Sequence, residues 1–132
     1  MKSSETDAVE LERYVTKLML DMGVPAHLKG YYYLRRAIII SQQDLETVDS
    51  VTKLLYPEIA KAFKTTGQKV ERAIRNAIEV SWSRGNQDTF EELFGYCAAE
   101  GKGRPTNSEY IARIADKVRL DIKNSDLCVM MA

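Results

Sequence analysis

Five polar side chains between positions 68 and 76 have the chemistry needed to read the edges of base pairs in duplex DNA. Arginine can donate two hydrogen bonds to guanine, glutamine and asparagine pair with adenine, and glutamate accepts from the amino group of cytosine. At about 100° per residue along a helix, these side chains fall in one arc and the apolar residues fall opposite. The predicted base-contacting residues are Gln68, Glu71, Arg72, Arg75 and Asn76. A solvated face of an amphipathic helix would give the same split, and a simple surface ion pair is the alternative for Glu71.

Polar and basic residues at two expected helix starts could bind phosphate groups. The first amides of a helix are unpaired and carry the positive end of its dipole, so they favour anions. Such contacts position a protein on DNA without reading its sequence. The predicted phosphate-contacting residues are Lys64, Thr66, Lys69, Thr106, Asn107 and Ser108. Ordinary helix capping is the alternative for the two threonines.

The chain lacks the residues that catalysis or metal binding would require. His27 is the only histidine, and no serine, cysteine or carboxylate pair stands at a useful spacing from it. Cys97 and Cys128 are far apart and form no zinc-ligand motif, so a reducing cytoplasm is the expected compartment. We expect neither an enzyme nor a metal site nor a cofactor.

The base-contacting candidates must be held by a helix-turn-helix. The sequence predicts a short helix around residues 59–63, a turn at 64–67 and a longer helix over 68–83 that ends before Gly85. Thr65 or Thr66 would cap the second helix. The small and apolar residues that this crossing of helices requires are Ala60, Val70 and Ala73. Lys64 departs from the commonest pattern because it occupies a turn position where glycine is frequent.

Helical signals also cover the rest of the chain. A capping box opens at Ser4 and a helix runs to Gly23, residues 30–41 form a second apolar stripe, and a Thr106-x-x-Glu109 box opens the last helix. Tyrosine and isoleucine triplets in the second helix could suit a strand, but no other strand-like run exists to pair with them. The apolar face expected for the last helix comprises Ile111, Ile114, Ala115, Val118 and Ile122.

These signals predict an all-α fold, a compact bundle of about six helices containing a helix-turn-helix. At 132 residues the chain is one domain, 1–132, with a core over about 5–122 and fraying at 1–3 and from about Lys123. No apolar stretch is long enough to cross a membrane.

Charge is unevenly distributed although the net charge is zero, with 19 basic and 19 acidic residues. Residues 53–84 and 101–119 carry an excess of basic side chains, whereas 85–100 carries only acidic ones. One face could therefore meet phosphates and another a protein, although solvated helix faces also produce such clusters.

Several segments together resemble the DNA-binding effector domains of the Spo0A family, sporulation response regulators of endospore-forming bacteria. The resemblance covers about Val15 to Leu120, in order. The matching segments are Gly23–Tyr31, Leu55–Lys61, Val70–Arg75, Trp82–Asn86, Leu93–Tyr96 and Pro105–Glu109.

The resemblance implies six helices, of which the fourth enters the major groove of tandem operator elements bound by copies arranged head to tail. It implies both activation and repression of transcription. By position, Glu71 and Arg72 match the family's base-reading pair and Arg75 a further contact. The family's receiver domain, which carries the phosphoacceptor, is absent from this chain, so we expect DNA binding without phosphorylation.

The resemblance also assigns a partner to the acidic segment 85–100, namely the sigma subunit of RNA polymerase. The predicted polymerase-contacting residues are Phe90, Glu91, Glu92, Leu93 and Phe94. Core packing is the alternative for the aromatic residues. A helical protein-interaction module without DNA binding is the alternative for the whole chain.

Overall fold

The computed structural model describes residues 4–44, 50–97, 101 and 103–131, and every regular element in these ranges is helical. The elements are α1 (Ser4–Asp21), α2 (Lys29–Gln43), the π-helical turn η1 (Val51–Leu55), α4 (Tyr56–Ala62), α5 (Gly67–Arg84), α6 (Gln87–Phe94) and α7 (Asn107–Met131). The all-α prediction is thus confirmed, with six α-helices in the described part of the chain.

The last helix is longer than the sequence predicts. Helix α7 continues to Met131, beyond the fraying expected from about Lys123. No glycine or proline interrupts the segment, so nothing local ends the helix earlier. The fraying expected at residues 1–3 lies outside the described residues.

Helix α2 forms the centre of the bundle and packs against α1, α5 and α7. Its side chains are buried on more than one side, as the wide apolar stripe in the sequence predicts. The buried residues of α2 are Gly30, Tyr31, Tyr33, Leu34, Ala37, Ile38 and Ser41.

A glycine fixes how closely α5 approaches α2. A Cβ at Gly30 would lie 2.1 Å from the carbonyl oxygen of Ala73 and 2.9 Å from the Cβ of Ala77, both on α5. Only glycine therefore allows this contact, and small residues on α5 complete it. The contact seats the inner face of α5 on the central helix.

Helix α7 also holds α1, through a polar contact at the edge of the core. The Tyr14 hydroxyl on α1 donates to the Asp121 carboxylate on α7, and the Lys117 ammonium lies 3.2 Å from the same carboxylate. Burial alone would raise the pKa of Asp121, but the hydrogen bonds from Tyr14 and Lys117 outweigh it and lower this pKa.

A buried chain of hydrogen bonds links α7, α5 and the end of α1. The Ser81 hydroxyl donates to the carbonyl of Met22 over 2.6 Å and lies 2.5 Å from the Tyr110 hydroxyl. Since Ser81 has a single proton, Tyr110 must donate to Ser81. Burial raises the pKa of Tyr110, which keeps its hydroxyl protonated as this chain requires.

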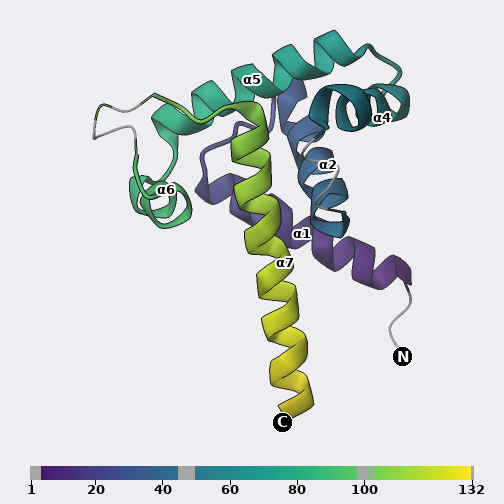
Figure 1. Cartoon of the computed structure of the whole chain (residues 1–132), viewed down its shortest axis with the longest axis vertical. Helices are drawn as coiled ribbons and strands as arrows, with labels where there is room; N and C mark the ends of the chain where they lie inside the picture. The colour runs from purple at the N-terminus through teal and green to yellow at the C-terminus, as the bar shows by residue number, and fades with distance from the viewer. Residues whose placement is uncertain (1–3, 45–49, 98–100, 102, 132) are drawn as a thin grey trace.

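Helix α5 lies across one end of the molecule, with α2 and α7 running away from it (Figure 1). One long side of α5 therefore packs on the bundle while the opposite side is outermost. None of the helices within the described ranges is long and apolar enough to cross a membrane.

Candidate nucleic-acid interface

The turn between α4 and α5 is built by the hydrogen bonds that end α4. The amide of Thr65 donates to the Ala60 carbonyl over 2.9 Å, and the amide of Lys64 donates to the Lys61 carbonyl over 3.4 Å. This pair of bonds is a Schellman motif, which requires a left-handed residue just after the helix. Lys64 is that residue, with φ of 55°. The position that the sequence marks as unusual is therefore a lysine held in a conformation that favours glycine.

Thr66 caps the start of α5. Its hydroxyl oxygen accepts from the amide of Lys69 over 3.3 Å. Of the two threonines that the sequence predicts as possible caps, Thr66 is therefore the cap. Thr66 and Lys69 are exposed, and Lys64 stands beside them. The three predicted phosphate ligands of this turn thus surround the positive end of α5.

The outer face of α5 carries the predicted base-contacting residues. Gln68, Arg72, Arg75 and Asn76 are exposed and Glu71 is half-buried. The helical periodicity therefore predicts the two faces correctly. The buried side chains on the opposite face are Val70, Ile74, Ala77 and Ile78.

The charged residues on this face are not equally available. Glu71 forms an ion pair with Arg75, one helical turn further on, and this pairing raises the pKa of Arg75. Arg72 has neither a hydrogen bond nor an ion pair within the described ranges. The surface ion pair considered for Glu71 therefore exists, but with Arg75 instead of Arg72.

The start of α7 lies against α5. The side-chain amide of Asn107 donates to the Tyr56 hydroxyl over 3.0 Å and to the Glu71 carbonyl over 3.3 Å. Thr106 and Glu109 form the predicted capping box, with the Thr106 hydroxyl accepting from the Glu109 amide. Of the three candidate phosphate ligands at this helix start, Thr106 and Asn107 thus have protein partners, and Ser108 is half-buried.

The bonds of Asn107 hold the start of α7 against α4 and the second turn of α5. A phosphate contact at the start of α7 stays a prediction, and the side chains of Thr106 and Asn107 are already engaged there. Tyr56 is a residue that the sequence analysis missed. It lies 51 positions from its partner Asn107.

Helix α6, at the far end of α5, is mainly a packing element. Phe90 is fully buried, with its ring centroid 4.8 Å from that of Trp82. Its predicted contact with polymerase is therefore wrong, because a fully buried side chain reaches no partner; core packing, the alternative, is what the structure shows. Leu93 and Phe94 are half-buried against the same core.

The acidic residues of α6 behave differently from its aromatic ones. Glu91 and Glu92 are exposed. They follow Asn86, which caps α6 by accepting from the amides of Asp88 and Thr89. A protein contact at Glu91 and Glu92 stays a prediction.

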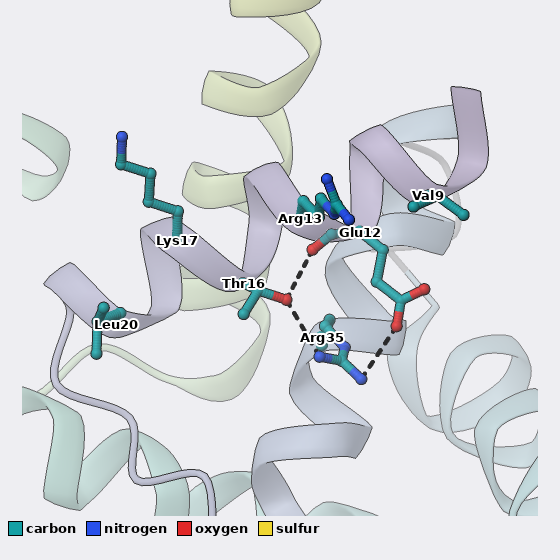
Figure 2. Close-up of a pocket in the computed structure, with 7 residues that line it drawn as sticks. All are labelled: Val9, Glu12, Arg13, Thr16, Lys17, Leu20 and Arg35. Carbon is teal, nitrogen blue, oxygen red and sulfur yellow. Dashed lines mark hydrogen bonds and ion pairs between the residues drawn. The ribbon is translucent and has the colours of Figure 1, made fainter. Parts of the chain in front are cut away.

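A groove of about 480 Å³ lies between α1 and α2 (Figure 2). Its polar centre is Arg35, which donates to the Thr16 hydroxyl over 3.1 Å and pairs with Glu12 at the same distance. The groove offers a charged, hydrogen-bonded lining without a histidine or cysteine. The residues that line it are Val9, Glu12, Arg13, Thr16, Lys17, Leu20 and Arg35.

A helical domain whose outer helix presents arginine and amide side chains, with exposed lysines at the start of that helix, belongs to the class of small all-α DNA-binding domains. Comparison with known families identifies which one. Residues 15–118 match the family described as "Sporulation initiation factor Spo0A C terminal", and the chain belongs to this family.

Family membership confirms the main predictions from sequence. The family is a DNA-binding effector domain that regulates transcription in sporulation, and it is not catalytic. The resemblance noted in the sequence is therefore confirmed, as is the prediction that the chain is not an enzyme. An interaction module without DNA binding is contradicted.

Proposed function

We propose that the chain recognises specific operator sequences by placing the outer face of α5 in the major groove. The observation that carries the proposal is Arg72, an exposed guanidinium on the outermost helix with no protein partner in the described ranges. Such a group can form a bidentate contact with guanine. Gln68 and Asn76 flank it on the same face and can pair with adenine.

Phosphate contacts would orient α5 in the groove. Lys64 and Lys69 lie at the start of α5, and the Asn107 bonds hold the start of α7 against the same helix. The lysines at the start of α5 and the first amides of α7 can engage the DNA backbone beside the reading face, the outer face of α5 with Gln68, Glu71, Arg72, Arg75 and Asn76.

We further propose that copies bind tandem elements head to tail and both activate and repress transcription in the bacterial cytoplasm. Contact with the polymerase sigma subunit would come from Glu91 and Glu92, with the half-buried Leu93 and Phe94 beside them on α6. These carboxylates are exposed and lie on α6 beyond the reading face, and acidic groups favour a basic protein surface over a polyanion. Family membership supports the transcriptional role in general.

The experiment that tests the proposal is Arg72→Ala. Operator sequences are first selected from random duplexes with the wild-type chain. The substitution should then cost about 1–3 kcal/mol at the selected site and leave binding to unrelated duplexes nearly unchanged. Arg13→Ala, an exposed arginine on α1, is the matched control and should change neither. An equal loss on both duplexes would reduce Arg72 to a phosphate ligand.

A further inference from the structure

The Glu71 and Arg75 side chains form an ion pair on the reading face. The Nη2 group of Arg75 lies 2.5 Å from both carboxylate oxygens of Glu71, and its Nε lies 3.1 Å from Oε1. The two side chains are 34% and 46% exposed for Glu71 and Arg75, so the pair stands at the surface where DNA would approach.

Pairing changes what Arg75 can do on DNA. An unpaired arginine that lies within reach of the DNA backbone binds any phosphate oxygen, and such sequence-independent attraction supplies most of the affinity for unrelated DNA. An arginine whose guanidinium already faces a carboxylate must first give up that partner.

A G·C base pair could offer new hydrogen-bond partners to Glu71 and Arg75 when their ion pair separates. Guanine offers two acceptors to an arginine, and the cytosine opposite offers an amino donor to a carboxylate. Glu71 and Arg75 could thus both find partners on G·C base pairs, whereas a phosphate satisfies only Arg75 and leaves Glu71 beside an anion.

We propose that Glu71 is a specificity-determining residue that restrains Arg75 from sequence-independent phosphate contacts. The inference rests on the proposed docking of α5 in the major groove. The backbone at this position is held separately, because the Glu71 carbonyl accepts from Asn107. Removing the Glu71 carboxylate therefore frees Arg75 while this anchor of the helix is retained.

A double-mutant cycle tests the inference on duplexes that lack the selected operator. Glu71→Ala should raise affinity for these duplexes about two- to fivefold, the range of an exposed ion pair, and should steepen the logarithmic salt dependence by about 0.9. In an Arg75→Ala background, the same substitution should give a clearly smaller gain and no steeper slope. The difference isolates Arg75 from the mere removal of a negative charge.

Two results would overturn the inference. One is an equal gain from Glu71→Ala with and without Arg75, and the other is no gain at all in a variant that circular dichroism shows to be folded. A wild-type chain that prefers no operator would instead refute the proposed function, so the two failures can be told apart.

Discussion

Replacing Lys64 by glycine should make the domain more stable and a weaker DNA binder. Lys64 has φ of 55°, and the left-handed conformation costs an L-residue about 1–2 kcal/mol. Glycine escapes this cost but adds about 0.5–1 kcal/mol of unfolded-state entropy. The net expectation is a gain of about 0.5–1 kcal/mol, or roughly 2–4 °C in Tm for a domain of this size.

The same substitution removes an exposed ammonium at the start of α5. If Lys64 meets a phosphate, Lys64→Gly should lower the slope of log K against log salt by about 0.9. Affinity should fall on operator and unrelated duplexes alike, because a phosphate contact reads no sequence. Thermal melts give the stability change, and binding titrations at several salt concentrations give the slope.

Two control variants separate the backbone from the charge. Lys64→Ala keeps the left-handed strain and loses the ammonium, so it should reduce binding without raising Tm. Lys64→Arg should keep both the charge and the salt slope. A stabilised glycine variant with an unchanged slope would remove Lys64 from the interface, and a destabilised one would show that the left-handed conformation of Lys64 costs no stability.

Three further outcomes are expected. Glu91→Lys combined with Glu92→Lys should leave operator affinity nearly intact and change stability by about 0.5 kcal/mol or less, while transcription activation in vitro falls; full activation would remove the polymerase contact. Gly30→Ala should destabilise the domain by about 1–3 kcal/mol or more in a denaturant titration, because its Cβ would meet a carbonyl oxygen of α5 at 2.1 Å. The lowered pKa of Asp121 means that its ionised carboxylate stabilises the fold at neutral pH. This contribution should be lost as the pH falls below the ordinary carboxyl range and through the lowered pKa. The melting temperatures of wild type and Asp121→Asn should therefore converge in acid.

Gly67→Ala is the control for Gly30→Ala. A Cβ at Gly67 would approach only the Tyr56 Cβ, at 3.8 Å, which is ordinary van der Waals contact. Its melting temperature should therefore stay close to that of the wild type. A comparable loss in both variants would show that close contact with α5 is not the cause.

Periodic features of the fold could be predicted because they depend on neighbours along one helix. The exposed and buried faces of α5 follow from a repeat of 3.6 residues, and so does the buried face of α7 from Ile111 to Val118. The Thr106 box follows from a spacing of three residues. The side-chain types on the outer face then indicate DNA.

Features that depend on distant segments could not be predicted. The sequence predicts Asn107 as a phosphate ligand, but its side-chain amide donates to Tyr56 and to the Glu71 carbonyl of α5. Only the fold brings these groups close to Asn107. Phe90 lies on an eight-residue helix whose pattern does not reveal its depth, and Trp82 from α5 helps to cover it. The sequence could not show whether Glu71 pairs with Arg72 or with Arg75, because both arginines lie near it on the same helix.

The hydrogen bonds that join α7 to the N-terminal part of the chain can form only late in the synthesis of the protein. Tyr110 donates to the Ser81 hydroxyl, which donates to the Met22 carbonyl, and Tyr14 donates to Asp121. Tyr14 and Met22 therefore obtain these hydrogen bonds only after α7 has been translated. Domains generally fold as units as the ribosome advances. Until α7 emerges, α2 lacks one of the helices that cover its buried residues, so part of its apolar surface is exposed on the nascent chain.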